Sequence, residues 1–265
     1  MKRYFPTEFV FQVFSFLIAF IVVHAVYVAE IRPTANAFLA EQAALMKIDE
    51  NHVPERSYYV VIRDYEQEAC FVLMFWALAI LSFKGLVTYR QLRQLEWDFL
   101  GLPENADITV EDAELISKRI RDEVPETQRK YLLPTVLLSA IERFSATRSI
   151  QDASAVVHAM CESEAERVDS ELSIIRYIAC AIPSIGFIGT VRGIGDALAQ
   201  AHKAVSGDIT GVTQSLGVAF NSTLIALLIS IVLMFIIHQI QVMQDRLVLH
   251  TERYCDSMFI RRLRG

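Results

Sequence analysis

The sequence predicts an all-α, polytopic membrane protein with four transmembrane helices and a helical cytoplasmic domain, whose third long helix runs into the third span. Four stretches are apolar over the roughly 20 residues that a helix needs to cross a bilayer. The other segments show helical spacing of apolar residues and no sustained alternation typical of strands. Of the 265 residues, 53% are hydrophobic and 21% charged, with a mean hydropathy of +0.34. That composition is typical of a membrane protein with sizeable soluble parts.

The first span is predicted over residues 9–29 and is preceded by Lys2 and Arg3. Its apolar core is longer than that of a signal peptide and no small-residue cleavage site follows, so we expect an uncleaved anchor. The second span is predicted over residues 70–89, and Lys84 near its end has a side chain long enough to extend toward the lipid headgroups. The third and fourth spans are predicted at about residues 174–199 and 212–238.

Basic residues near the span ends predict that both termini are cytoplasmic, because lysine and arginine are retained on that side. The residues that share this side are Lys2, Arg3, Lys84, Arg90, Arg93, Arg167, Arg176, Arg246 and Arg253. The predicted domains are an anchor at 1–29, a periplasmic segment at 30–69, the second span at 70–89, a helical cytoplasmic domain at 90–172, a transmembrane hairpin at 173–241 and a cytoplasmic tail at 242–265.

The cytoplasmic domain is predicted to contain three helices. Thr109 followed by Asp112 has the spacing of a capping box and marks the start of the first. The second, within residues 129–144, is predicted to be interrupted by Pro134. The third begins near Ile150 and meets no breaker before it enters the third span, so we expect one helix over residues 150–199.

Spans three and four each carry a face of small residues. In span three these residues follow one another at spacings of four and three, and in span four the same spacing recurs. The two faces consist of Ala179, Pro183, Gly186, Thr190, Gly193 and Ala197, and of Ser215, Ala219, Ser222, Ala226 and Ser230 with Asn221 and Thr223 beside them. Small faces of this kind let helices approach closely in lipid.

Thr190 and Ser222 are predicted to lie at the same depth, because they are equally far from residue 206 in the middle of the loop that joins the two spans. Two interpretations follow. The faces line a cavity that admits water or a partner helix, or they are ordinary packing surfaces.

Arg192 and Asp196 are four residues apart on span three, off the small face, and are expected to form an ion pair. Ionisable residues inside a span are usually functional. The alternative is that the helix leaves the membrane early, which would place this pair at the headgroups.

Several classes of function are disfavoured. The net charge of −6 argues against a nucleic-acid partner. The sequence has no HExxH, no GxSxG and no paired intramembrane aspartates, so we do not expect an enzyme. Its histidines form no i,i+4 pair, so no metal site or cofactor is expected. The four cysteines are scattered and are expected to be free thiols: Cys70, Cys161, Cys180 and Cys255.

The stretch IPSIGFIGTVRGIGDAL, followed by VTQSLGVAFNSTLIALLISI, resembles the paired-helix signature of the MotA/TolQ/ExbB proton channel family. The resemblance covers about residues 173–241. The motif is closer to the ExbB and TolQ type, whereas four spans with both ends inside are similar to the MotA arrangement.

The resemblance implies the pore-forming subunit of a stator-type motor in the bacterial inner membrane. A homopentamer would surround a dimer of a single-span partner similar to ExbD, TolR or MotB, which carries an intramembrane aspartate. Ion flow, H⁺ in the first place and Na⁺ as the alternative, would drive rotation. A passive membrane scaffold is the alternative function, and it would tolerate Thr190→Val.

The same resemblance implies which residues line the pore. Thr190 matches the threonine of the family's G-T-V motif, and Ser222 or Thr223 matches the hydroxyl position of the next span. An alternative alignment puts Ala219 at the family's threonine position, with the hydroxyls one turn later. The full set of expected pore-lining residues is Thr190, Ser222, Thr223, Asn221, Gly186, Gly193 and Ala219.

Overall fold

The computed structural model describes residues 7–48, 55, 57–97, 99–101 and 107–264. Within them the chain is helical and forms no strand, apart from an isolated bridge between Ile108 and Leu263. The helices long and apolar enough to cross a membrane lie at Phe9–Met46, Tyr65–Gln94, Ile150–Ala199 and Thr210–Arg262. The predicted all-α fold with four candidate spans is therefore confirmed for the part of the chain that the structure describes.

The chain divides into two compact units, which are described separately. The span unit comprises Met1–Ser82 and Ile174–Ile237, and the head unit comprises Phe83–Ser173 and His238–Gly265. The long helices α4 (Tyr65–Gln94), α8 (Ile150–Ala199) and α10 (Thr210–Tyr254) each contribute residues to both units. The predicted continuous helix over residues 150–199 is confirmed.

The first helix of the span unit continues past the predicted end of the first span. Helix α1 (Thr7–Val26) passes through a π turn (Tyr27–Ile31) into α2 (Arg32–Ile48), and the short α3 (Tyr58–Val61) follows. The wide turn comes just before Pro33, which has no N–H to continue the regular hydrogen-bond ladder. Such a turn lets the helix pass a proline without ending.

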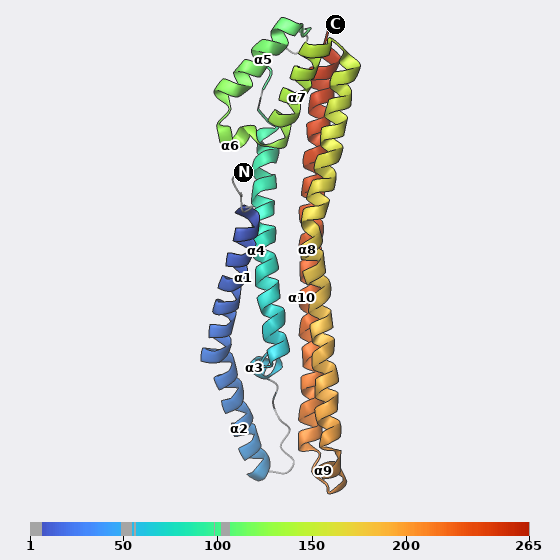
Figure 1. Ribbon diagram of the computed structural model, residues 1–265. Coiled ribbons are helices and arrows are strands. Elements are labelled where there is room, and N and C mark those ends of the chain that lie inside the picture. The colour runs from blue at the N-terminus through green and yellow to red at the C-terminus, as the bar shows by residue number, and fades with distance from the viewer. Residues whose placement is uncertain (1–6, 49–54, 56, 98, 102–106, 265) are drawn as a thin grey trace, which may run out of the picture. The chain divides into compact units, whose positions relative to one another are not determined.

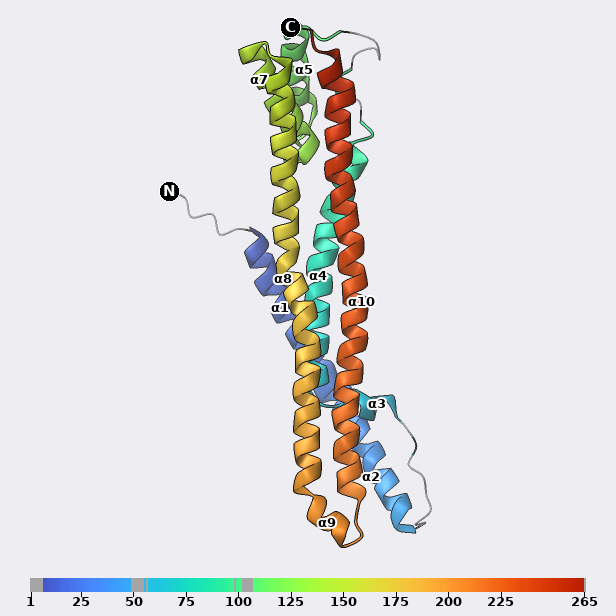
Figure 2. The same cartoon turned by 90° about the vertical axis from the view of Figure 1, so that its right-hand side faces the viewer.

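In the span unit α8 and α10 lie side by side, joined by α9 (Ala201–Val205) (Figures 1 and 2). Helix α8 contains Pro183, which leaves the carbonyl of Ala179 without its usual donor. The hydroxyl of Ser230 on α10 donates to that carbonyl at 3.0 Å. A serine of the small face therefore satisfies the group that the proline frees, as is required where water is scarce.

The head unit packs three short helices against the ends of α8 and α10. These are α5 (Val110–Glu123), α6 (Glu126–Arg129) and α7 (Leu132–Thr147), with a π turn (Cys255–Phe259) and a 3₁₀ turn (Ile260–Arg262) after α10. Large side chains fill its core, and Phe144, Leu137 and Phe259 are fully buried. The amide of Ile108 donates to the carbonyl of Arg262 at 2.7 Å, which ties the end of the chain to the start of α5.

The capping box at the start of α5 is confirmed. The hydroxyl of Thr109 accepts from the amide of Asp112 at 3.3 Å, and the Asp112 carboxylate accepts from the amide of Thr109 at 3.0 Å. The hydroxyl of Thr109 also donates to this carboxylate at 2.7 Å. These hydrogen bonds, with the hydroxyl contributing most, lower the pKa of Asp112 from its ordinary value.

Two local predictions are wrong. Pro134 does not interrupt a helix, because it lies in the first turn of α7, where the N–H groups have no intrahelical acceptor. Lys84 does not extend outward toward the headgroups, because its side chain is only 7% exposed and its ammonium pairs with Glu171 at 2.6 Å. A carboxylate from α8 takes the place that the headgroups were expected to fill.

Candidate ion pathway

The contact between α8 and α10 in the span unit is made by residues too small to keep the helices apart. A methyl group added at Gly186 would lie 2.5 Å from the Cβ of Ala226, and one added at Gly193 would lie 2.8 Å from the backbone nitrogen of Ala219. Both distances are shorter than carbon atoms tolerate. The predicted small faces therefore pack against one another within one chain, and Gly186, Gly193 and Ala219 lie in that contact.

Thr190 and Thr223 meet at the centre of this contact. Their hydroxyl oxygens lie within hydrogen-bonding distance of each other. The Thr190 hydroxyl also donates to the carbonyl of Ala219 at 2.9 Å, and the Thr223 hydroxyl donates to the carbonyl of Gly186 at 3.1 Å. Each threonine thus reaches the backbone of the opposite helix.

The two hydroxyls have fewer protons than the contacts around them could use. Each carries one proton and two lone pairs. With one proton each, the two hydroxyls make at most two of these three hydrogen bonds at a time, and their oxygens keep lone pairs for a donor or cation nearby. Threonine does not titrate near neutral pH, so the pair can orient or hydrate an ion but cannot store a proton.

Ser222 does not join this pair. Its side chain is buried and donates to the carbonyl of Val218 in its own helix at 2.9 Å. It lies against Gly189, where an added Cβ would be 2.6 Å from its hydroxyl oxygen. Asn221 is half-buried beside it. Of the two hydroxyl residues that the sequence proposed opposite Thr190, Thr223 therefore makes the contact.

The predicted ion pair between Arg192 and Asp196 is wrong. Arg192 donates from Nε and Nη2 to the two carboxylate oxygens of Glu66 on α4, at 2.7 and 2.8 Å. A planar guanidinium matches both oxygens of one carboxylate, which gives a stronger bond than a single contact with Asp196 one turn away. Glu66 was missed by the sequence analysis, and its only signal was its place at the acidic edge of the second apolar stretch.

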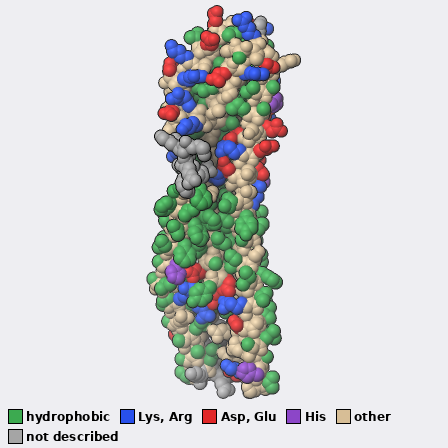
Figure 3. Space-filling model, viewed as in Figure 1, with side chains coloured by type: hydrophobic (Ala, Val, Ile, Leu, Met, Phe, Trp, Pro, Cys, Tyr) green, Lys and Arg blue, Asp and Glu red, His purple; other side chains and the backbone are tan. Residues whose placement is uncertain are grey.

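A second group of charges lies on another side of α4. Glu68 is buried and contacts Nδ1 of His24 at 2.6 Å, and it also forms an ion pair with Arg32. The guanidinium of Arg32 lies over the ring of Tyr65 at 4.2 Å from its centroid. Figure 3 shows acidic, basic and histidine side chains grouped beside a wide hydrophobic surface. Arg192 and Glu66 are thus one of several ion pairs among the charged side chains of the span unit.

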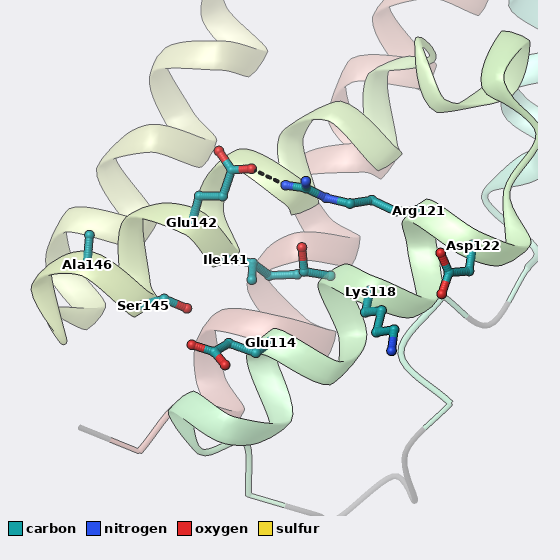
Figure 4. Close-up of a pocket in the computed structure, with 9 residues that line it drawn as sticks. Glu114, Lys118, Arg121, Asp122, Ile141, Glu142, Ser145 and Ala146 are labelled. Carbon is teal, nitrogen blue, oxygen red and sulfur yellow. Dashed lines mark hydrogen bonds and ion pairs between the residues drawn. The ribbon is translucent and has the colours of Figure 1, made fainter.

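The other features that could form a functional site are weaker candidates. All four cysteines are free thiols, as predicted, and no group of metal-ligating side chains occurs among the described residues. A hollow of about 610 Å³ lies in the head unit between α5 and α7. Figure 4 shows it lined by charges of both signs, with Arg121 paired to Glu142 at 2.5 Å. It contains none of the motif residues.

Part of the chain is similar to a known protein family. Residues 128–253 match the model of the MotA/TolQ/ExbB proton channel family. The match includes all of α7 and α8 and nearly all of α10, and so contains Thr190, Arg192 and Thr223. The resemblance found in the sequence is confirmed over this segment. No curated protein and no solved structure matches the chain.

Proposed function

We propose that this chain, whose residues 128–253 form a MotA/TolQ/ExbB proton channel family domain, is the pore-forming subunit of an ion-driven motor in the bacterial inner membrane. The single observation that carries the proposal is the hydroxyl pair of Thr190 and Thr223 in the contact between α8 and α10. In this proposal five copies surround a dimer of a single-span partner, and both termini of each copy are cytoplasmic.

The partner supplies the group that accepts the ion. Hydroxyls ease the cost of a charge at this depth by hydrating it, but they do not take up protons at neutral pH. An aspartate on the partner's span would be protonated beside the hydroxyls and would release its proton after moving past them. The translocated ion is H⁺, with Na⁺ as the alternative.

The energy available per ion is that of the membrane potential. One elementary charge moving through 100 mV releases about 2.3 kcal/mol, to which a pH difference adds. Each protonation step would change the balance of contacts between the partner and the five copies, and so turn the ring about the partner.

The first experiment is native mass spectrometry of the tagged complex extracted gently from its membrane. Five copies with two copies of a small single-span protein that carries an intramembrane aspartate support the proposal. A monomer or dimer that persists in several detergents overturns it and leaves the passive scaffold.

Ion flux of the same complex in liposomes tests the hydroxyl pair. Thr190→Val keeps the shape of the side chain and removes its hydroxyl, and we expect flux to fall at least about tenfold while assembly is unchanged. Ser222→Ala is the matched control, since that hydroxyl bonds only within its own helix. Equal flux in wild type and Thr190→Val would show that the hydroxyl pair does not act on the ion, whereas absence of flux in both would favour the scaffold.

A further inference from the structure

The ion pair between Glu66 and Arg192 joins helices that are far apart in the sequence. Both guanidinium bonds are short, at 2.7 and 2.8 Å, and link residues 126 positions apart. The Glu66 side chain is 12% exposed, whereas that of Arg192 is 43% exposed. A nearly buried carboxylate thus holds a guanidinium that still faces outward.

This pair lies next to the hydroxyl pair. The Cγ of Glu66 would be 3.2 Å from a Cβ added at Gly189, the neighbour of Thr190. Arg192 follows Thr190 by two residues, about 3 Å along the helix axis. A charge on either side chain therefore acts on an ion that approaches Thr190 and Thr223.

We propose that Glu66 is the counter-ion that neutralises Arg192 at the outer mouth of the ion path, so that the pair sets the electrostatic barrier to a cation. The inference rests on the proposed function. Arginine remains protonated at any physiological pH, so an unpaired Arg192 would repel H⁺ or Na⁺ from the hydroxyls. Glu66 is a positioning residue here and does not itself accept the transported ion.

Other charges act on Arg192 as well. Asp64 and Asp196 attract it, and Asp64 is paired with Arg63 at 3.7 Å. These groups stay in place when Glu66 or Arg192 is changed. Differences in ion flux between variants of Glu66 and Arg192 therefore reflect the charges of these two residues alone.

The test compares three variants of the extracted complex in liposomes. Glu66→Gln leaves Arg192 without its carboxylate partner, and we expect cation flux to fall about tenfold, which is the effect of one unit charge roughly 12 Å from the ion at an effective dielectric constant of about 20. Arg192→Gln leaves a negative charge, and flux is expected to equal or exceed that of wild type. The double variant has no net change in charge and is expected to restore wild-type flux.

Salt dependence and a neighbouring control variant test whether the charge of Glu66 causes the effect. The loss in Glu66→Gln is expected to shrink as salt is raised, because ions screen exposed charges. Glu68→Gln removes the same charge two residues along α4, where the carboxylate contacts His24 and Arg32, and we expect a smaller loss of flux. If Glu66→Gln does not assemble, the reversed pair Glu66→Lys with Arg192→Glu replaces it, and the inference requires wild-type flux from that assembly.

The possible results distinguish a failure of the inference about Glu66 and Arg192 from a failure of the proposed function. Equal losses in both single variants without recovery in the double variant would show a purely structural pair and overturn the inference alone, as would lost flux in an assembled reversed pair. A wild-type complex that carries no ion flux overturns the proposed function, and the inference with it.

Discussion

Helices α8 and α10 pass through both units of the molecule, yet they are held by different residues in each. In the span unit their closest approaches are made by glycine, alanine, serine and threonine, with hydroxyls donating to carbonyls of the opposite helix. In the head unit α8 contributes Val157 and α10 contributes Leu247 to a core of large side chains.

The solvent explains the difference. In lipid, burying a leucine against another helix gains little, because the lipid tails are equally apolar, so close approach and hydrogen bonds hold the helices. In water, removing apolar surface is the main driving force, and large side chains supply the most area. The composition of each contact therefore indicates the medium in which each part of a helix lies.

The largest expected effect is in the head unit. Phe144 is fully buried in its core, and Phe144→Ala should lower the free energy of unfolding by about 3–5 kcal/mol through lost burial and the cavity left behind. Phe187→Ala is the control in the span unit, because that ring is 65% exposed. Thermal unfolding of the purified protein measures both, and a larger loss for Phe187→Ala would contradict the comparison.

A smaller effect is expected where the helices approach most closely. Gly193→Ala places a methyl group 2.8 Å from two backbone atoms of α10, which should cost about 1–3 kcal/mol because the backbone cannot move aside. Gly195→Ala is the matched control two residues away, since nothing lies within 4 Å of the added methyl. Both variants can be compared by their unfolding temperatures. Equal unfolding temperatures for the two variants would show that the close approach of α8 and α10 does not stabilise this hairpin.

The smallest expected effects have opposite signs in the two units. Ser230→Ala removes the donor to the Ala179 carbonyl, and should destabilise the protein by about 1 kcal/mol. Thr251 in the head unit is fully buried, and its hydroxyl has no hydrogen-bond partner among the described residues. Thr251→Val should therefore stabilise by about 1 kcal/mol. Unfolding temperatures of the two variants that shift in the same direction would contradict this contrast.

In the head unit one local feature could be predicted from the sequence and another could not. In the head unit the Thr109–Asp112 capping box was predictable, because a cap involves residues three apart and needs no tertiary contact. Pro134 was misplaced, because the effect of a proline depends on whether it falls in the first turn or the interior of a helix. Element boundaries were therefore less predictable than element types.

By itself, the sequence determined the all-α class, the four apolar spans, the unbroken helix α8 and the small faces on α8 and α10. Each of these depends on length, composition or a spacing within one helix, which are local properties. The family signature is equally local, since its motifs lie within single spans.

Only the tertiary structure decided which groups meet. Arg192 selects Glu66, which is 126 residues away, over Asp196 one turn along its own helix. Thr223 rather than Ser222 faces Thr190, because adjacent residues differ by about 1.5 Å in depth but point in directions about 100° apart. Depth can be counted along a sequence, whereas the rotation of a helix about its axis is set by what packs against it.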